Sequence, residues 1–331
     1  MNRTIILNKR PAGKPQPSDF KMITEEVPSL LDHEIMLKTR FVSVDPYLRG
    51  RMNDAKSYIA PFQLNKPISS GMIAEVTESS HPGFKQGDFV AGMLEWKEFQ
   101  KSNGQGLTLV DATKAPLSAY LGILGMTGLT AYLGLTEIGA PKSGETLVVS
   151  GAAGAVGSVV GQIGKIMGCR VVGIAGTDEK TAMLKSDFGF DEAINYHTTA
   201  DMSQAIAKAC PDGVDVYFDN VGGTITDSVL ANINKFARII VCGSISAYNA
   251  TTMPTGPRLE PFILKNSALM QGFIIGNYSS KFPEAFSKLS SWLKEGKLTY
   301  RETIVEGFEN TPQAFIDLFD GKNKGKMIVK M

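Results

Sequence analysis

SGAAGAVGSVVGQIGK, residues 150–165, is the stretch that decides the fold. It follows the apolar run 146–149, and a strand, a turn of small residues and an apolar-periodic helix in that order are what a dinucleotide-binding turn requires. Gly154 would let the backbone approach a pyrophosphate, and Gly157 would let the new helix pack closely on its strand. Ala152 stands in place of the first glycine of the GxGxxG pattern. Small residues also allow close packing without any ligand, so this alternative stays open.

Strand and helix patterns alternate after this turn. Apolar runs predict strands at 169–176, 193–196, 214–220, 238–244 and 273–278, with helices at 178–188, 202–210 and 224–233. A further helix follows Pro283 and stops at Gly296. Repeated strand–helix units of this kind predict an α/β domain with a doubly wound parallel sheet.

Residues 4–121 show the period of an all-β domain instead. Short strands separated by Gly, Pro and Asn predict a compact, barrel-like fold. The tail returns to strand patterns with one short helix near Thr311, and we expect it to rejoin the first domain. The predicted domains are therefore 1–122 with 297–331, which is discontinuous, and 123–296.

VDPYLRGRMNDAKSYIAPF, residues 44–62, is predicted to be a loop rather than core, because it is polar and interrupted by prolines. It carries Tyr47, Arg49, Arg51 and Tyr58. Loops on rigid scaffolds often hold binding groups. The aromatic residues could contact a substrate or cap the barrel, and both interpretations stay open.

The charge balance gives no indication of nucleic acid or an anionic membrane as a partner. Lys and Arg number 34 against 33 acidic residues, for a formal charge of +1, without a sustained basic run. No apolar stretch approaches the roughly 18 residues of a membrane span, and MNRTIILNKRPAGKP lacks the pattern of a secretory signal. We therefore expect a cytoplasmic protein whose partners are small molecules or copies of itself.

The cysteines and histidines point to neither disulfides nor a metal. Cys169, Cys210 and Cys242 are far apart and form no CxxC pair, which fits a reducing compartment. The three histidines are isolated, and none lies within ligand spacing of a cysteine. We predict structural or surface roles for these residues and no metal site.

Candidate ligand-binding residues gather at one edge of the predicted sheet, because ligands of open α/β sheets bind beyond the carboxyl ends of the strands. These ends are at residues 154–157, 176–180, 196, 220 and 242–248. Asn220 could bond the ribose or nicotinamide side of a cofactor, or serve only as a turn residue before Gly-Gly. Tyr248 could donate a hydrogen bond to a developing oxyanion, or be a core or interface tyrosine.

The second strand bears on the choice of cofactor. NAD sites usually have an acidic residue about 20 positions after the glycines, and this strand ends without one. Lys180, one turn into the next helix, could pair with the 2′-phosphate of NADP. Asp178 or Glu179 could instead bond the ribose of NAD, although both suit the first turn of a helix capped by Thr177. We expect NADP.

Several strings in a fixed order resemble the zinc-independent medium-chain dehydrogenase/reductases, in the branch of leukotriene hydroxydehydrogenase/prostaglandin reductase, plant alkenal double-bond reductases and bacterial NADPH-dependent curcumin reductase. The strings are VDPYLRGRM, GMTGLTAYLGL, GETLVVSGAAGAVGSVVGQIGK, GCRVVGIAG, YFDNVGG, ISAYNAT, QGFII and EGFENTPQAF with GKNKGK. DPYLRGRMNDAKSY and SAYNATTMPTGP look closest to the curcumin-reductase members. Gly151, where relatives often carry alanine, and Thr127, where they carry proline, depart from the pattern. The Gly-His-Glu of zinc-dependent relatives is absent.

The resemblance implies a GroES-like barrel domain and a Rossmann domain, with the active site in the cleft between them. It further implies NADP(H) as cofactor, a homodimer that uses FIIGNY as a sheet edge, and Tyr47 and Tyr58 as residues that cover or orient the substrate. The implied cofactor-binding residues are Gly154, Ala155, Val156, Gly157, Lys180, Tyr196, Asn220, Cys242, Gly243, Ser244, Ile245, Ser246, Ala247, Tyr248, Phe273, Ile274, Ile275 and Asn323.

The reaction expected on this basis is NADPH-dependent reduction of a carbon–carbon double bond conjugated to a carbonyl. Hydride would go to the β-carbon, and Tyr248 with a cofactor hydroxyl would stabilise the enolate oxygen without a metal. Two alternatives stay open: a quinone reductase of the same fold, and an NADPH-binding sensor or structural protein without turnover. A zinc alcohol dehydrogenase is the weakest alternative.

Overall fold

The computed structural model describes all 331 residues and divides them into two units. The first comprises Met1–Leu121, Glu302–Asn323 and Met327–Met331, and the second comprises Gly122–Arg301 and Lys324–Lys326. No helix in either unit combines the length and the apolar character needed to cross a membrane.

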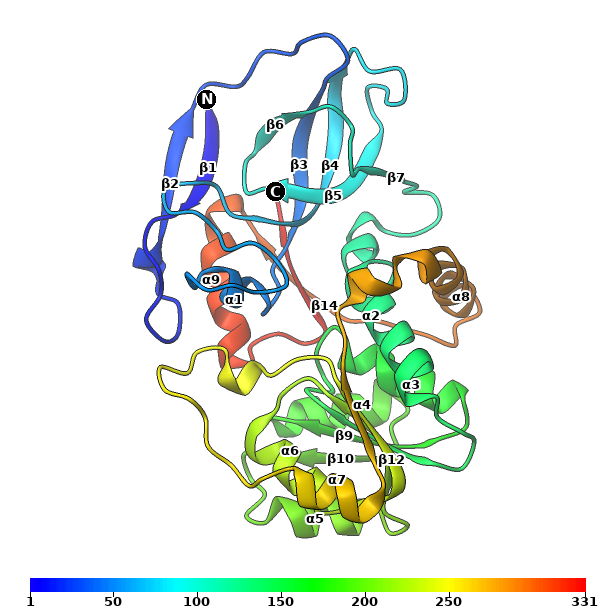
Figure 1. The fold of residues 1–331 in the computed structure, drawn as a ribbon. Helices are drawn as coiled ribbons and strands as arrows, with labels where there is room; N and C mark the ends of the chain where they lie inside the picture. Colours follow the sequence, from blue (N-terminus) through cyan, green and yellow to red (C-terminus); the bar gives the residue numbers. More distant parts are fainter. The chain divides into compact units, whose positions relative to one another are not determined.

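The second unit is built on a parallel sheet of six strands in the order β10-β9-β8-β11-β12-β13. Figure 1 labels β9, β10 and β12 among these strands. Every neighbouring pair in this order is parallel. The chain reverses its direction of winding between β8 and β11, so the sheet is doubly wound and the predicted fold class is confirmed. The strands are β8 (Thr146–Ser150), β9 (Arg170–Ala175), β10 (Glu192–Asn195), β11 (Val214–Asp219), β12 (Ile233–Val241) and β13 (Leu269–Gly272).

Helices cover both faces of this sheet. The apolar residues of α5 and α6 form one buried cluster with Val148, Tyr217 and Ile239, and partly buried residues of α7 pack against it. α3 packs on the opposite face, where Gly164 lies so close to Leu147 that an added Cβ would be 2.5 Å from its side chain. The helices are α2 (Met126–Gly134), α3 (Gly157–Ile166), α4 (Asp178–Phe188), α5 (Met202–Ala209), α6 (Gly223–Leu230), α7 (Glu260–Asn266) and α8 (Phe282–Lys294).

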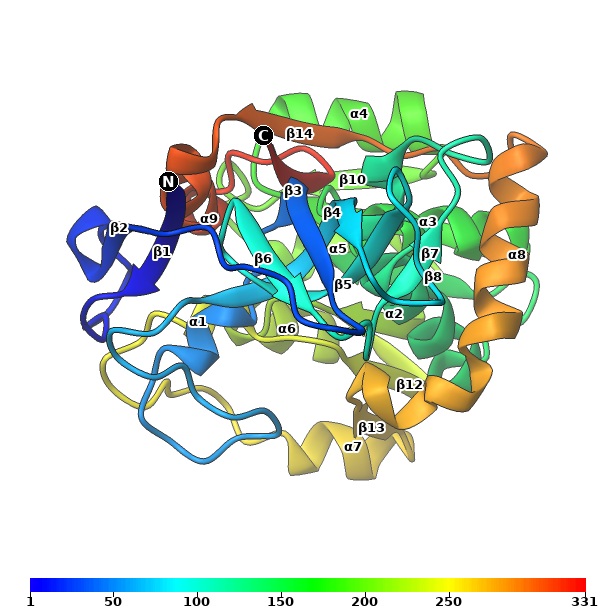
Figure 2. The ribbon, with the colours of Figure 1, turned by 90° about the horizontal axis from the view of Figure 1, so that it is seen from above.

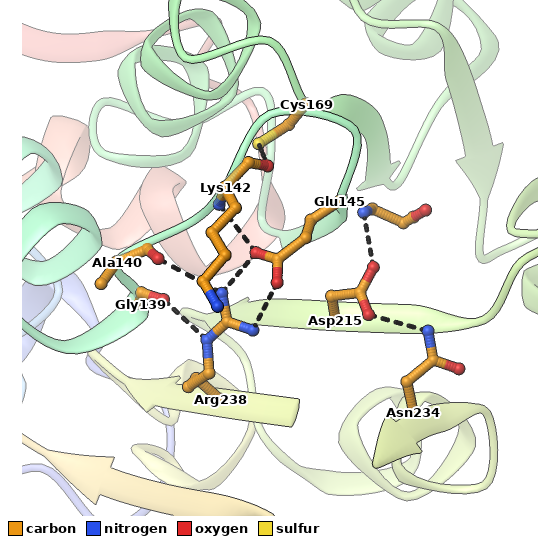
Figure 3. Close-up of polar contacts among 9 residues, drawn as sticks. Gly139, Ala140, Lys142, Glu145, Cys169, Asp215, Asn234 and Arg238 are labelled. Carbon is orange, nitrogen blue, oxygen red and sulfur yellow. Dashed lines mark hydrogen bonds and ion pairs between the residues drawn. The ribbon is translucent and has the colours of Figure 1, made fainter. Parts of the chain in front are cut away.

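Two polar clusters join the amino ends of the central strands (Figure 3). Arg238 of β12 donates to Glu145, just before β8, with one N–H at 3.0 Å from Oε1. Asp215 of β11 accepts the backbone N–H of Thr146 at 2.9 Å and the amide of Asn234 at 2.8 Å. These contacts stabilise the sheet at the end opposite the edge predicted to bind a cofactor.

The first unit is mainly antiparallel sheet, as predicted, in the order β14-β15-β3-β4-β5-β7 with β6 on β3. Trp96 is fully buried in its core, and the indole N–H donates to Ser70 Oγ at 2.8 Å. α9 lies beside β2, where the rings of Phe20 and Phe315 meet edge to face with centroids 6.2 Å apart (Figures 1 and 2). The elements are β1 (Asn2–Leu7), β2 (Phe20–Glu25), β3 (Ile35–Ser43), α1 (Leu48–Arg51), β4 (Ser69–Ser79), β5 (Phe89–Glu95), β6 (Phe99–Ser102), β7 (Thr108–Val110), β14 (Glu302–Glu306), α9 (Thr311–Asp317) and β15 (Lys326–Lys330).

The predicted strand at 273–278 is wrong. The sixth strand is β13, which ends at Gly272 beside the last residue of β12, and a 3-10 helix covers Ile275–Lys281. Phe273 turns its ring onto Phe218, with centroids 6.4 Å apart. The apolar composition of this segment therefore reflects packing, and the outer edge of the sheet is β13 rather than FIIGNY.

The predicted helix at 224–233 is too long. α6 ends at Leu230, and β12 begins at Ile233, earlier than the strand expected from 238. Phe236 has a φ of 64° inside β12, which breaks the alternation that would have marked the strand.

The prediction that residues 44–62 form a loop outside the core is also wrong in part. Leu48–Arg51 form the short helix α1, and Met52 and Phe62 are fully or nearly buried in the core of the first unit. Arg49 is 3% exposed and donates to the carbonyl oxygens of Pro11 and Gly13. A buried guanidinium needs such acceptors, so Arg49 has a structural role instead of contacting a ligand.

Candidate dinucleotide-binding and active site

The glycine turn after β8 has the close approaches that its sequence predicts. α3 begins at Gly157, where an added Cβ would lie 2.5 Å from the carbonyl oxygen of Gly151 and 2.7 Å from Cα of Ala152. Gly151 has a φ of 58°, in the left-handed region that favours glycine. The first N–H groups of α3 have no intrahelical acceptor, so this turn can bind an anion.

Asp219, which was not among the predicted site residues, fixes the carboxyl ends of β8 and β11. Its side chain is 2% exposed. The carboxylate accepts hydrogen bonds from three hydroxyls and two backbone N–H groups: Ser150 Oγ at 2.9 Å, Tyr217 OH at 2.9 Å, Thr226 Oγ1 at 2.6 Å, and Val221 N and Gly222 N at 2.9 Å each. Its backbone carbonyl accepts the N–H groups of Cys242 and Gly243. The sequence does place an acidic residue at the end of an apolar strand, and such a residue has to be hydrogen-bonded if it is buried.

Asn220 follows directly and holds the two strands together. Its side-chain N–H donates to the carbonyl oxygen of Ser150 at 2.8 Å, and its backbone N–H donates to Ser150 Oγ at 2.9 Å. Asn220 therefore has a structural role that joins two strands and does not depend on an unusual backbone angle. Its contact with a cofactor stays a prediction.

Residues 242–248 follow β12 at the same edge. Ser246 Oγ donates to the carbonyl oxygen of Val221 at 2.6 Å, which ties this segment to the loop after β11. The hydroxyl of Tyr248 accepts the backbone N–H of Ser244 at 3.4 Å. Burial raises the pKa of Tyr248 above its ordinary value, so the phenol keeps its proton at neutral pH. The structure thus brings Tyr248 and Asn220 to one edge.

A second group of predicted residues lies at the end of β9. The hydroxyl of Tyr196 would lie 3.0 Å from a Cβ added to Gly176. Thr177 caps α4 as expected, since its hydroxyl accepts the backbone N–H of Lys180 at 3.2 Å. Burial, together with the nearby ammonium of Lys324, lowers the pKa of Lys180.

The two acids considered as ribose ligands of NAD are engaged within the chain. Asp178 accepts the amide N–H of Asn195 at 2.7 Å. Glu179 forms an ion pair with Lys324. Both acids lie in the first turn of α4, and both have partners elsewhere in the chain. This agrees with the interpretation that they are acids of the first helical turn rather than ligands of a ribose.

The other predicted cofactor residues have different surroundings. The ring of Phe273 packs against Gly134, where an added Cβ would lie 2.6 Å from it. Ile274 is 37% exposed, and Ile275 begins the following 3-10 helix. Asn323 belongs to the first unit. The ring of Phe273 is thus used in packing, and its contact with a cofactor stays a prediction.

The predicted substrate residues belong to the first unit. Tyr47 packs against the core of that unit, and burial raises its pKa. Tyr58 is 61% exposed. Arg51 stacks its guanidinium over the ring of Phe62 at 3.9 Å, and its charge interacts with both phenols. One tyrosine is thus anchored and the other is accessible.

Asn249 tests whether this edge fits a nicotinamide dinucleotide. Its side-chain oxygen is buried and accepts no hydrogen bond. Buried acceptors are rarely left without a donor, and the residue follows Tyr248 directly. A dinucleotide offers hydroxyl and amide donors for this oxygen, while the turn at Gly154 and the lysines at α4 suit its phosphates. The residues at this edge therefore fit the cofactor.

Zinc does not fit. No three His, Cys, Asp or Glu side chains form a group that could hold a metal ion.

A cavity of about 380 Å³ in the first unit is lined by none of the predicted site residues, and Arg3 on its wall is paired with Glu98 and Glu309. This cavity is a charged surface groove rather than the candidate active site.

Comparison with known proteins identifies two family matches that follow one another along the chain. Residues 3–110 match the N-terminal domain of oxidoreductase, and residues 155–292 match a family described as zinc-binding dehydrogenase. The Bacillus subtilis (strain 168) protein YfmJ is 57% identical over 329 residues, which are 99% of this chain and 97% of that protein.

Two further relatives carry names that describe their chemistry. The NADPH-dependent curcumin reductase of Escherichia coli (strain K12) is 44% identical over 335 residues, covering 100% of this chain and 97% of that protein. The crystal structure of CurA from Vibrio vulnificus in complex with NADPH is 44% identical, with a TM-score of 0.94 over 99% of each chain. The first unit is thus GroES-like and the second Rossmann-like, and the chain belongs to the medium-chain dehydrogenase/reductase family, in the branch of the curcumin, prostaglandin and 2-alkenal reductases.

Proposed function

We propose that the protein is an NADPH-dependent reductase of carbon–carbon double bonds conjugated to a carbonyl, acting on alkenals, alkenones or curcumin-like substrates. The observation that carries the proposal is the phenol of Tyr248, which lies beyond the carboxyl end of β12 among the residues predicted to bind the cofactor. Full-length similarity to NADPH-dependent curcumin reductase supports the same cofactor and reaction class. The proposal includes a site without zinc, because the side chains offer no group of metal ligands.

The glycine turn and α4 would hold the cofactor. The N–H groups at the start of α3 would bind the pyrophosphate, and Lys180 would bind the 2′-phosphate. Tyr196, beside Gly176 at the end of β9, would lie along the adenosine ribose. Asn220 and residues 242–248 would line the nicotinamide side.

Tyr248 would stabilise the charge that develops on the substrate. The reduced nicotinamide, when bound, supplies hydride for the β-carbon of the enone. Negative charge then collects on the carbonyl oxygen as an enolate, and the hydroxyl of Tyr248 donates a hydrogen bond to it. Because burial raises the pKa of Tyr248, this donor is present at neutral pH. A proton delivered to the α-carbon completes the reduction.

Tyr47 and Tyr58 would contact the substrate from the segment 44–62. The exposure of Tyr58 supports this role, since an accessible phenol can move onto a ligand. Tyr47, anchored on the core, would supply a fixed surface beside it.

We also propose a homodimer joined along β13. This strand is hydrogen-bonded on one side only, to β12, and an open strand edge favours pairing with another chain. Leu264 of α7 is 83% exposed and Leu269 of β13 is 48% exposed, which supplies apolar surface beside that edge.

The free thiols of Cys169, Cys210 and Cys242 favour a reducing compartment, and we propose the cytoplasm.

A substrate panel with both nicotinamide cofactors tests the proposal. Purified protein is incubated with alkenals, alkenones, curcuminoids or simple quinones, and oxidation of NADPH and of NADH is followed by absorbance. We expect turnover with the enones and NADPH, with product analysis showing a saturated carbon–carbon bond and an intact carbonyl. Turnover with quinones alone would contradict the proposal in favour of a quinone reductase, and binding without any turnover would favour a sensor.

A further inference from the structure

Lys324 is held beside the glycine turn by the backbone that follows it. The N–H of Gly325 donates to the carbonyl oxygen of Ala153 at 2.8 Å, and Gly325 forms a parallel β-bridge with Gly154. Gly325 has a φ of 67°, and an added Cβ would lie 1.9 Å from the carbonyl oxygen of Arg301. No other residue type fits this position, so the segment Lys324–Lys326 crosses the turn in one defined conformation.

The ammonium of Lys324 lies at the start of α4. It forms an ion pair with Glu179, which is in the first turn of that helix. It is also close enough to lower the pKa of Lys180, in addition to the larger effect of burial. Two cations from segments far apart in the sequence therefore meet at the helix end that Thr177 caps.

The first turn of α4 also carries two carboxylates, which balance the formal charge of the two lysines. Asp178 accepts a hydrogen bond from the amide of Asn195, and Glu179 is the acid that pairs with Lys324. The side chain of Glu179 is 70% exposed and that of Lys324 is 44% exposed, so their ion pair is screened by solvent and weak. A phosphate monoester carries more negative charge than a carboxylate and has three acceptor oxygens, so it can compete for the same ammonium.

We propose that Lys324 is a second cation for the 2′-phosphate of NADP(H), and that Glu179 holds this ammonium in position until the phosphate replaces the carboxylate. The inference rests on the proposed function for the choice of cofactor. Lys180 and Lys324 then bind the phosphate from two sides, and Glu179 tunes the preference for NADPH over NADH. NADH has no 2′-phosphate that could replace the Glu179 carboxylate at Lys324. This exchange therefore does not contribute to the binding of NADH.

The test measures cofactor binding by isothermal titration calorimetry, without any substrate. NADPH and NADH are titrated into the wild-type protein and into Lys324→Gln, Lys324→Arg and Glu179→Gln. Lys185→Gln is the matched control, because Lys185 is also on α4 and paired with a glutamate, Glu192, but lies in the last turn. Thermal denaturation of each variant reports whether the fold is kept.

Lys324→Gln is expected to weaken NADPH binding about tenfold and leave NADH binding unchanged, because one charge-assisted contact to the phosphate is lost. Lys324→Arg keeps the charge and retains most of the affinity. Glu179→Gln releases the ammonium and strengthens NADPH binding about three- to fivefold, with no effect on NADH. Lys185→Gln changes neither affinity.

An equal loss of NADPH and NADH affinity in Lys324→Gln would overturn the inference, since Lys324 would then only support the turn. Unchanged NADPH affinity in Lys324→Gln or weaker NADPH binding in Glu179→Gln would overturn it as well. Failure of the proposed function looks different. In that case the variants show the selectivity described here while the substrate panel gives no turnover. A wild-type protein that binds neither cofactor would overturn both the inference and the proposed function.

Discussion

The hydroxyl of Ser150 donates to the carboxylate of Asp219 at 2.9 Å, and this bond joins the last residues of β8 and β11. The same serine accepts the backbone N–H of Asn220. The two strands flank the position where the winding direction of the sheet changes. The edge that would receive a cofactor is therefore fixed by a buried hydrogen-bond network before any ligand arrives.

Asp219→Asn is expected to lower both stability and cofactor affinity. An amide N–H cannot accept the bonds that the carboxylate accepts, so buried donors lose their partners, at a cost of about 3 kcal/mol in the free energy of unfolding. The loops after β11 and β12 also lose their anchor, and NADPH binding weakens. Urea denaturation and calorimetry measure the two effects. Asp215→Asn, at the other end of β11, is the control: it should cost about 1 kcal/mol and leave NADPH affinity unchanged.

Tyr248→Phe is expected to lower kcat about 100- to 1000-fold while NADPH affinity stays within a few-fold, because one preorganised donor to the enolate is lost. Single-turnover kinetics with a saturating enone measure the chemical step. Burial raises the pKa of Tyr248, so its neutral form persists above pH ~10, and the wild-type rate should show no loss of this donor below that pH. Near-normal turnover in the phenylalanine variant would remove Tyr248 from the mechanism.

Asn249→Ala is expected to weaken NADPH binding without lowering the stability of the cofactor-free protein. The buried oxygen of Asn249 has no hydrogen-bond donor in the chain, so its removal should change the unfolding free energy of the cofactor-free protein by less than about 0.5 kcal/mol. NADPH affinity should fall about tenfold if the cofactor supplies that donor. Asn232→Ala is the matched control, because the amide of Asn232 donates to Ser203 and Ser228 and its loss should cost about 1–2 kcal/mol. A large loss of stability with unchanged affinity in Asn249→Ala would contradict the assignment.

Leu269→Lys is expected to convert the proposed dimer to a monomer, because a charge on the β13 edge opposes pairing with a second strand. Light scattering after size-exclusion chromatography measures the mass. Leu109→Lys serves for comparison, since Leu109 of β7 in the first unit is similarly exposed and should leave the mass unchanged. A wild-type protein that is monomeric at high concentration would refute the dimer directly.

The local patterns of the sequence predicted the parallel sheet and the glycine turn, because both depend on neighbouring residues. Residues 150–165 place small side chains where α3 approaches the turn, and the contacts of Gly157 require them. The strand expected at 273–278 failed because register with β12 depends on the assembled sheet. An apolar run cannot distinguish pairing from packing of rings such as that of Phe273.

The polar organisation of the site was harder to anticipate, because it joins residues that are distant in the chain. The carboxylate of Asp219 meets Ser150 only after β8 and β11 have become neighbours. Lys324 reaches Glu179 only because Gly325 is bonded to the glycine turn. Arg49 was expected in a loop outside the core, because exposed and buried guanidinium groups look alike in a sequence.

The assignment of Lys324–Lys326 to the Rossmann-like unit matters for protein engineering. A chimera that transplants only residues 122–301 into a foreign barrel leaves this short segment behind. The tail of the recipient would then supply the residues that lie beside the glycine turn. Exchange of cofactor preference between homologues thus requires the transfer of two segments, the main block and the three residues centred on Gly325.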